Sequence, residues 1–381
     1  MNFDLTEDQI MIRDSAREFA QAEIAPSSIE RDIKGEFPAD IIKKLGELGF
    51  LGMMVPPEYG GAGLDTISYV LAMIEVSKVD ASVGVIMSVN NSLVCFGLEK
   101  YGSDFIKEKY LVPLAKGEKL GAFALSEPEA GSDATKQKTT ADKDGNHFVI
   151  NGIKNWITNG HSADYVLVMA TTDKAKGHHG ISTLVVEKGT PGFGYGKKED
   201  KMGIRSSDTS SLTFENCKVP AQNLVWEEGK GFNFAMNTLN GGRIGIAAQA
   251  IGIAEASLEA SLKYSKERKA FGQTISNFQG IQFKLADMSV KVDAAKLLTL
   301  KAAALKDAGK KYYKEAAIAK LYSSKIAVEC ALDAIQIHGG YGYVREYLVE
   351  RYLRDAKITE IYEGTSEIQK VVISRALLDE N

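Results

Sequence analysis

The run YVLVMATT, residues 165–172, is rich in Val and other residues that favour β-strands, and it contains no Gly or Pro. Three further runs share this character: HFVI (147–150), ISTLVVE (181–187) and SLTFENCKV (211–219). Asp144-Gly145 and Asn151-Gly152 are short-range turn signals. Together these features predict an antiparallel sheet, in the form of a small β-barrel, over residues 119–228.

The residues before this sheet, 1–118, show helical patterns. Thr6 and Gln9 have the spacing of a capping box, which marks a helix start. Pro38 suits the first position of another helix. The stretch 67–98 consists mostly of apolar and small residues, so we expect helix that is buried on most sides.

The residues after the sheet, 229–381, return to helical patterns. Apolar residues repeat at alternating spacings of three and four: Phe278, Ile281, Leu285, Met288, Val292 and Ala295. This seam predicts long helices packed as a bundle, whose outer face is available for oligomerisation. The predicted fold is therefore mixed and mainly α, with a helical domain (1–118), a β domain (119–228) and a helical bundle domain (229–381).

Composition excludes several classes of function. The 381 residues have a net charge of −4, which argues against nucleic acid as a partner. The N-terminus lacks a basic signal-peptide region and no run of 18 apolar residues occurs, so we expect no membrane insertion. Cys95, Cys217 and Cys330 are far apart, as is typical of reduced, buried thiols, and no metal-binding motif is present. We expect a cytoplasmic protein or a processed organelle-matrix form.

Four stretches are rich in Gly and hydroxyl residues: FALSEPEAGSDA (123–134), NWITNG (155–160), RKAFGQTISNFQ (268–279) and QIHGGYGY (336–343). Taken singly, each has an ordinary structural interpretation: Trp in a strand is usually core, and GGYGY usually ends a helix. No Rossmann or P-loop motif is present. Together, the Trp face, the hydroxyl groups and an Arg are compatible with a flat aromatic cofactor that bears a pyrophosphate.

The stretch TEIYEGTSEIQ, residues 359–369, places Glu363 between an apolar dipeptide and Gly364. Ile361 and Tyr362 are expected to desolvate this carboxylate, which raises its pKa. Ser366 and Gln369 have the spacing of a capping box for the last helix. A helix N-terminus favours the ionised carboxylate and opposes the shift, but we expect desolvation to dominate. The alternative is an ordinary carboxylate near a helix cap.

Six motifs in order make the chain recognisable: FALSEPEAGSDA, NWITNG, LNGGRIGIAAQAIGIAEA, ERKAFGQ, QIHGGYGY and RDAKITEIYEGTSEIQ. The sequence resembles the acyl-CoA dehydrogenase family over essentially its whole length, and is most similar to the short-chain, butyryl-CoA members. The resemblance implies a helical domain, a β-barrel and a four-helix bundle, with FAD between barrel and bundle. It also implies a homotetramer, built as a dimer of dimers, which passes electrons to an electron-transferring flavoprotein.

The resemblance also assigns residues to the site. Those expected to contact FAD from the same chain are Phe123, Leu125, Ser126, Gly131, Ser132, Trp156, Ile157, Thr158, Thr365 and Glu367. Those expected to reach a cofactor across a subunit interface are Arg268, Phe271, Gln279, Gln336, Gly339 and Gly340. Those expected to line the acyl-CoA site are Ser132, Asn240, Arg243, Tyr362 and Gly364. Two positions depart from the family pattern: Ser126 replaces a frequent Thr, and Asn240 replaces an Asp found in many short-chain relatives.

The implied reaction is α,β-dehydrogenation of a short acyl thioester, butyryl-CoA to crotonyl-CoA. Glu363 is expected to take the α-proton while the β-hydrogen leaves as hydride to the flavin. Some relatives place the base before the arginine of the GR segment, but that position is Gly242 here, which cannot serve. The alternatives are an isobutyryl or 2-methyl-branched-chain dehydrogenase, an acyl-CoA oxidase, and a catalytically silent flavoprotein subunit of an electron-transfer complex.

Overall fold

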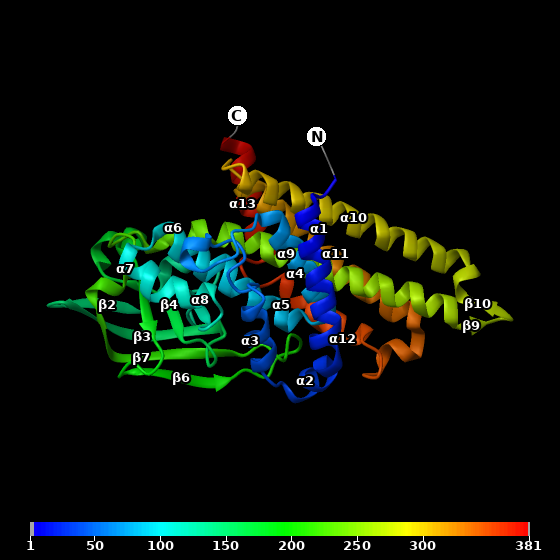
Figure 1. Cartoon of the computed structure of the whole chain (residues 1–381), viewed down its shortest axis with the longest axis horizontal. Helices are drawn as coiled ribbons and strands as arrows, with labels where there is room; N and C mark the ends of the chain where they lie inside the picture. Colours follow the sequence, from blue (N-terminus) through cyan, green and yellow to red (C-terminus); the bar gives the residue numbers. More distant parts are fainter. Residues whose placement is uncertain (1–3, 380–381) are drawn as a thin grey trace.

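The computed structural model describes residues 4–379, and the molecule is elongated (Figure 1). A sheet occupies one end and is partly covered by the helices of residues 96–115, the first N-terminal helices lie in the middle, and long C-terminal helices extend to the other end. The mainly helical prediction, with a β region between two helical ones, is confirmed.

The N-terminal zone contains eight α-helices among the described residues: α1 (Glu7–Phe19), α2 (Ser28–Lys34), α3 (Ala39–Glu47), α4 (Thr66–Val79), α5 (Ala81–Ser88), α6 (Phe96–Tyr101), α7 (Asp104–Ile106) and α8 (Val112–Ala115). The capping box is confirmed: the Thr6 hydroxyl accepts from the Gln9 amide at 3.2 Å, and the Gln9 side chain accepts from the Thr6 amide at 3.0 Å. Pro38 is the cap residue before α3 and not its first helical residue, so that prediction is wrong by one position.

The apolar stretch 67–98 is almost entirely buried, as predicted, but it is divided into α4, α5, a π-helical turn (Val89–Cys95) and α6. Asp80 separates α4 from α5, and its carboxylate accepts a hydrogen bond from the Ser82 amide at 2.9 Å. One helical stretch, Ala81–Tyr101, is long and apolar enough to cross a membrane, but 94% of its most apolar window is buried inside the protein. Its burial is that of a core helix.

The middle zone forms an eight-stranded sheet with β1 (Gly121–Ala124), β2 (Thr140–Asp144), β3 (His147–Thr158), β4 (Tyr165–Thr171), β5 (Ile181–Glu187), β6 (Phe193–Lys198), β7 (Thr209–Pro220) and β8 (Leu224–Val225). The strand order is β6-β7-β3-β2-β4-β5-β8, with β1 paired to β4. All four predicted runs are strands. Within residues 4–379 no pairing joins β6 to β8, so the pairings do not close into the predicted barrel. The β1–β4 pairing is parallel, unlike the antiparallel arrangement expected.

The two turn signals have different outcomes. Asp144-Gly145 ends β2 before β3, as predicted, and Gly145 has a φ of 58°. Asn151-Gly152 is not a turn but lies inside β3, where the pairing with β7 shifts register. A Cβ on Gly152 would approach Thr139 to 2.5–2.8 Å, so Gly is needed for the close approach of the neighbouring chain.

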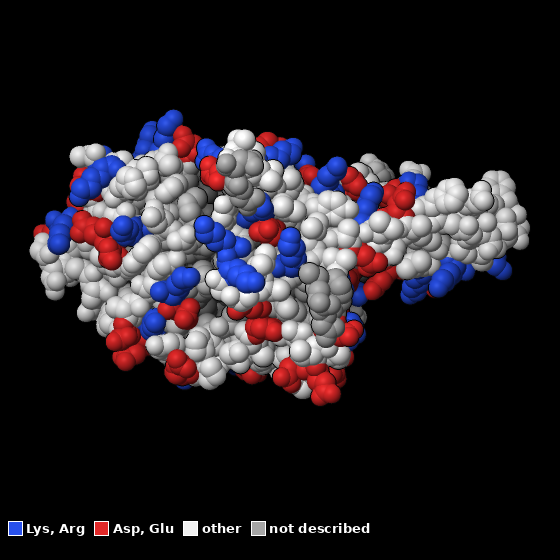
Figure 2. Space-filling view, turned by 90° about the horizontal axis from the view of Figure 1, so that it is seen from above, with Lys and Arg blue, Asp and Glu red and all other residues white. Residues whose placement is uncertain are grey.

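The C-terminal zone contains the long helices α9 (Gly231–Glu267), α10 (Gln279–Asp307) and α11 (Tyr313–His338), then α12 (Val349–Thr359) and α13 (Ser366–Asp379). A short hairpin of β9 (Lys269–Ala270) and β10 (Gln273–Thr274) lies at the far tip. Along the predicted seam of α10, Met288, Val292 and Ala295 are buried. On the face seen in Figure 2, charges of both signs mix over the body, and the projecting tip is largely uncharged.

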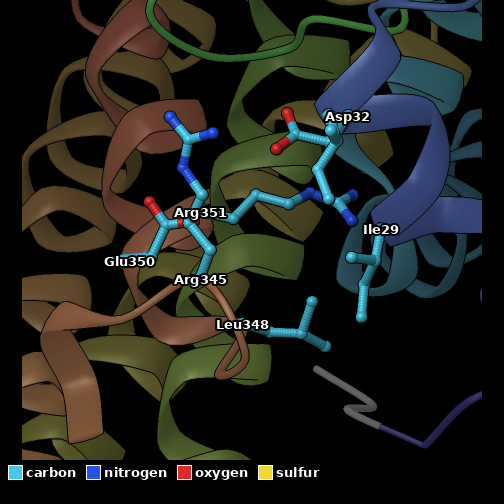
Figure 3. Close-up of a pocket in the computed structure, with 7 residues that line it drawn as sticks. Ile29, Asp32, Arg345, Leu348, Glu350 and Arg351 are labelled. Atoms are coloured by element: carbon cyan, nitrogen blue, oxygen red, sulfur yellow. The ribbon is translucent and has the colours of Figure 1, made fainter.

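A small cavity lies between α2 and the segment that leads into α12 (Figure 3). It is lined by Ile29, Asp32, Ile33, Arg345, Leu348, Glu350 and Arg351. Its volume is about 10 Å³, enough for one water molecule and far too small for an acyl chain. We therefore interpret it as a gap in a domain junction.

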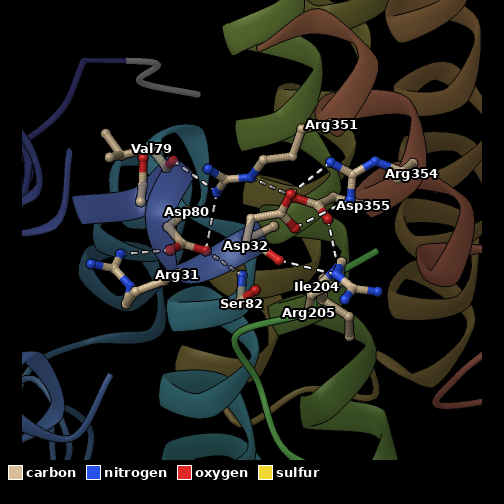
Figure 4. A network of polar contacts seen from close by, with 12 residues as sticks. Arg31, Asp32, Val79, Asp80, Ser82, Ile204, Arg205, Arg351, Arg354 and Asp355 are labelled. Carbon is tan, nitrogen blue, oxygen red and sulfur yellow. Dashed lines mark hydrogen bonds and ion pairs between the residues drawn. The ribbon is translucent and has the colours of Figure 1, made fainter. Parts of the chain in front are cut away.

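An ion-pair network joins all three zones at this junction (Figure 4). Arg351 pairs with Asp80 of the N-terminal zone at 3.1 Å and with Asp355 at 3.3 Å. Asp355 in turn accepts from the backbone amide of Ile204, in the middle zone, at 2.5 Å. Further pairs are Arg31–Asp80 at 2.7 Å and Arg354–Asp32 at 2.7 Å. The network fixes α12, the helix that leads into TEIYEGTSEIQ.

Candidate active site

The loop between α12 and α13 holds two successive residues in left-handed conformation. Glu363 has a φ of 51° and Gly364 a φ of 93°. For a non-glycine residue this conformation costs on the order of 1–3 kcal/mol and persists only where the surroundings impose it. Such strain is concentrated at functional sites, so the loop is a candidate for one.

The Glu363 carboxylate lies in an enclosed environment. The residue is half-buried, but its Oε2 atom is shielded from solvent and accepts no hydrogen bond from any described residue. Burial raises the pKa of Glu363 to about 7, while the charges of Lys320 and Arg243 oppose the rise. The direction agrees with the expectation from the sequence. A carboxyl group with this pKa exchanges protons readily near neutral pH, as a general base must.

Part of the predicted shielding is wrong. Ile361 is 49% exposed and contributes to the surface, whereas Tyr362 packs against the core and donates its hydroxyl to Gln249 on α9. Burial raises the pKa of Tyr362 well above its ordinary value, so its hydroxyl stays protonated. Tyr362 therefore anchors the loop to α9.

Gly242 on α9 leaves the space that Glu363 occupies. A Cβ at Gly242 would lie 2.0 Å from Oε2 of Glu363 and 2.8 Å from Cδ2 of Leu93. One turn farther along α9, a Cβ at Gly245 would lie 2.6 Å from the Tyr69 hydroxyl. The glycines of LNGGRIG thus let the loop and α4 approach α9 closely.

Asn240 and Arg243 contact each other near this carboxylate. Arg243 is 6% exposed and donates to Oδ1 of Asn240 at 2.7 Å, while its Nε has no hydrogen-bond partner among the described residues. Burial lowers the pKa of Arg243, and the charge of Glu363 is the first opposing influence. Asn240 is thereby the polar partner of a buried cation.

The cap of α13 differs from the prediction. Thr365, not Ser366, is the capping residue, since its hydroxyl accepts from the Ile368 amide at 3.3 Å. The Gln369 side chain does not complete a capping box but donates to the carbonyls of Glu363 at 3.3 Å and Gly364 at 2.9 Å. Glu367 is exposed, and its own backbone amide and the Thr365 hydroxyl lower its pKa.

The residues of FALSEPEAGSDA and NWITNG come together beside the sheet. The Asn155 amide donates to the Ser126 carbonyl at 2.8 Å. The fully buried ammonium of Lys154 donates to the Leu125 carbonyl at 3.1 Å and to Glu127 at 2.8 Å. A buried ion pair therefore ties the two segments to each other.

Trp156 and Ile157 have opposite environments. Trp156 lies at a register shift of β3 with a φ of 62°, and its side chain is 62% exposed. Ile157 is 2% exposed and packs into the core of the sheet, so its predicted cofactor contact is restricted to its backbone. Phe123 is half-buried and stacks on Phe234 of α9 at 6.3 Å, and Thr158 is half-buried. Gly131 and Ser132 are exposed in the loop after β1.

The remaining predicted residues form a second group at the ends of α9 and α11, at the start of α10 and in the β9–β10 hairpin, which lies away from the sheet (Figure 1). Arg268, Gly339 and Gly340 line a hollow of about 670 Å³, where the Arg268 guanidinium lies 5.4 Å from the ring centre of Tyr341. Phe271 is 95% exposed. Gln279 and Gln336 are exposed as well. One copy of the chain therefore does not gather all the predicted residues into one site.

Sequence reasoning missed Lys320, Gln249 and the role of Gln369. Lys320 lies on α11 with its side chain fully buried, and its ammonium donates to the Gly364 carbonyl at 2.7 Å. Its signal was a single charge within the apolar and small residues of AAIAK (316–320). Gln249 is 0% exposed and meets the Tyr362 hydroxyl.

The sequence profiles of a known family match three segments of the chain. The N-terminal domain of acyl-CoA dehydrogenase matches residues 6–118, the middle domain matches 122–217, and the C-terminal domain matches 229–378.

Individual relatives agree along their whole length. The chain is 50% identical over 374 residues to a short-chain-specific acyl-CoA dehydrogenase of Clostridium acetobutylicum, covering 98% of this chain and 99% of that one. The solved structure of butyryl-CoA dehydrogenase from Megasphaera elsdenii has a TM-score of 0.98 at 50% identity, covering 99% and 100% of the two chains. A chain from work on the electron transferring flavoprotein of Acidaminococcus fermentans also has a TM-score of 0.98, at 53% identity, with 99% and 100% coverage. The chain described here belongs to the acyl-CoA dehydrogenase family.

Proposed function

We propose that this enzyme catalyses α,β-dehydrogenation of short-chain acyl-CoA, converting butyryl-CoA to crotonyl-CoA, with Glu363 as the base. The observation that carries the proposal is the enclosed Glu363 carboxylate, whose Oε2 has no hydrogen-bond partner among the described residues and fills the space left by Gly242. Identity of about half the residues to short-chain-specific relatives supports the substrate class.

The residues of the chain supply the proton-transfer half of the reaction. Glu363 accepts the α-proton. Its raised pKa reduces the difference in pKa between the carboxyl group and the weakly acidic α-carbon of the thioester. The backbone amide of Glu363 donates to no backbone acceptor within residues 4–379, so it is available for the thioester carbonyl. A donor at that carbonyl stabilises the charge that develops as the proton leaves. Tyr362, Gly364, Asn240, Arg243 and Ser132 are the proposed substrate-lining residues.

The residues beside the sheet fit FAD. Trp156 presents an exposed aromatic face from a strained backbone, and a Cβ at Gly131 would meet no atom within 4 Å. When bound, FAD supplies the acceptor for the β-hydrogen, which leaves as hydride. The residues that would hold it from one chain are Phe123, Leu125, Ser126, Gly131, Ser132, Trp156, the backbone of Ile157, Thr158, Thr365 and Glu367.

The second group would complete a cofactor site on a neighbouring copy. The group consists of Arg268, Phe271, Gln279, Gln336, Gly339 and Gly340. An exposed Arg beside open glycines suits a phosphate group.

The exposed face of α10 forms a surface for another copy. Its three apolar residues, Phe283, Val290 and Leu297, are spaced seven apart and are 53–68% exposed. We therefore propose a homotetramer, a dimer of dimers, in which α9, α10, α11 and α13 form the bundle. The proposed domains are 1–118, 119–228 and 229–381.

The proposed electron acceptor is an electron-transferring flavoprotein. The support is structural likeness to a chain from work on such a flavoprotein of Acidaminococcus fermentans. Reduction of that flavoprotein by the enzyme and butyryl-CoA would test this step directly.

A substrate panel with an artificial electron acceptor tests the main proposal. Straight acyl-CoAs from C4 to C8 are compared with isobutyryl-CoA and 2-methylbutyryl-CoA, and we expect the highest kcat/KM for butyryl-CoA. A preference for a branched substrate would assign the branched-chain reaction, and peroxide formation under air would assign an oxidase. No turnover of any member by flavin-loaded protein would indicate a silent flavoprotein. Glu363→Gln must abolish turnover, because the amide cannot accept the α-proton.

A further inference from the structure

Lys320 is a buried cation directly behind the loop of the base. Its side chain is fully buried on α11, which is rare for lysine unless the ammonium is paired. Within residues 4–379 its hydrogen-bond partner is the Gly364 carbonyl at 2.7 Å, and the ion pairs found there do not include it. The ammonium group of Lys320 is therefore stabilised by a loop carbonyl, and no carboxylate of a described residue lies at contact distance. This arrangement indicates that Lys320 supports the loop.

The bond from Lys320 restrains the strained part of the loop. Gly364 follows Glu363, and both residues have positive φ. Gln369 donates to the carbonyls of the same two residues, so two buried side chains from different helices hold two adjacent peptide groups. A strained backbone conformation of this kind persists only where several surrounding contacts impose it. The direction of the Glu363 side chain follows from the orientation of these peptides.

The charge of Lys320 also acts on the carboxylate. Lys320 is the strongest of the influences that lower the pKa of Glu363, and Arg243 on α9 is the next. Burial lowers the pKa of Lys320 to about 8, and Glu363 is the first influence that opposes the fall. The other titratable groups are Tyr69 on α4 and Tyr362 beside Glu363, and Glu360 and Glu367 near Lys320. Both tyrosines have raised pKa values and stay neutral, so the charges of Lys320 and Arg243 set how far the pKa of Glu363 is lowered.

We propose that Lys320 is a positioning residue for dehydrogenation: it fixes the Gly364 carbonyl so that Glu363 faces the substrate, and its charge favours the ionised carboxylate. Lys320 reaches neither substrate nor cofactor in this role and acts through the loop. The proposal rests on the proposed function, in which Glu363 is the base.

The test compares pH profiles of kcat/KM for butyryl-CoA in flavin-loaded enzyme. Lys320→Met removes both the charge and the hydrogen bond. In this variant we expect the acidic limb of the kcat/KM profile to move to higher pH by about 1 unit, and kcat to fall about tenfold or more. In Lys320→Gln, which keeps a donor, we expect the same shift with a smaller fall in kcat. In Gln369→Leu, which changes no charge, we expect a lower kcat and an unmoved limb.

Lys306→Met is the matched control. Lys306 is a half-buried lysine at the end of α10, and burial lowers its pKa to about 8. The charged groups that affect this pKa are Asp307, Lys100 and Glu99, and Glu363 is not among them. We expect an unmoved limb and unchanged kcat. An acidic limb that is also unmoved in both Lys320 variants overturns the proposal, whatever happens to kcat.

Hydrogen exchange followed by mass spectrometry gives a second readout that needs no turnover. We expect faster exchange in the peptide that spans residues 360–369 of Lys320→Met, and unchanged exchange in the sheet. Unchanged exchange in 360–369 overturns the positioning role. Absence of butyryl-CoA turnover by the unmutated enzyme refutes the proposed function instead, and the exchange measurement still decides whether Lys320 holds the loop.

Discussion

Gly242→Ala tests directly where the proposed base, Glu363, lies. The new Cβ would stand 2.0 Å from Oε2 of Glu363, whereas such atoms do not approach closer than 3.0 Å in real structures. The carboxylate must therefore withdraw by about 1 Å, and Cδ2 of Leu93, at 2.8 Å from the new Cβ, is also too close for the methyl group to be accommodated by moving Leu93 alone. Misplacement by 1 Å costs about 100-fold in rate, or about 2.7 kcal/mol in the activation barrier.

The assay measures kcat for butyryl-CoA with an artificial electron acceptor, alongside flavin content and the thermal midpoint. Gly241→Ala is the matched control, because its Cβ would meet no atom closer than the Ser92 carbonyl at 3.5 Å. Both changes replace Gly by a residue that favours helix by about 1 kcal/mol. We expect Gly241→Ala to keep its activity and Gly242→Ala to lose about 100-fold at similar flavin content. Equal activities in the two variants would refute the placement of the carboxylate against α9.

Three further predictions concern charge, assembly and pH. Lys154→Met strands the buried Glu127 carboxylate and should lower the free energy of unfolding by about 3–5 kcal/mol in chemical denaturation, with a loss below 1 kcal/mol contradicting the pairing. Val290→Asp on α10 should shift light-scattering mass below that of the unmutated oligomer without changing the circular dichroism spectrum, and an unchanged mass would exclude this face from the interface. Turnover of butyryl-CoA should rise with pH through about 7, because Glu363 has a raised pKa and accepts a proton only when ionised, whereas a flat profile between pH 5.5 and 8 would exclude it as the titrating base.

Local sequence patterns predicted the elements of the fold well where one physical rule dominated. The β-rich runs became strands, and the Thr6–Gln9 capping box formed as written. Asn151-Gly152 did not form a turn, because tertiary packing against Thr139 made use of the same glycine for a bulge. The parallel pairing of β1 with β4 depends on contacts distant in sequence, which no local pattern encodes.

The site was predictable in its residue types but not in its supports. Glu363 stood out by its neighbours, yet Ile361 turned outward and the shielding came partly from α9. Gln369 matched a capping pattern but donates to loop carbonyls, because Thr365 already caps α13. Lys320 is 43 positions before Glu363, so only the packing of α11 beneath the loop reveals their relation.

The ion pairs around Asp355 have a consequence for how activity arises during folding. Arg351 and Asp355 belong to α12, whose last residue is Thr359, and they are held by Asp80 from one zone and Ile204 from another. The loop that carries the proposed base, Glu363, is therefore held in place by contacts from all three zones. On this geometry, we expect the proposed activity to require the docked arrangement of all three zones, because the position of α12 depends on contacts from each of them.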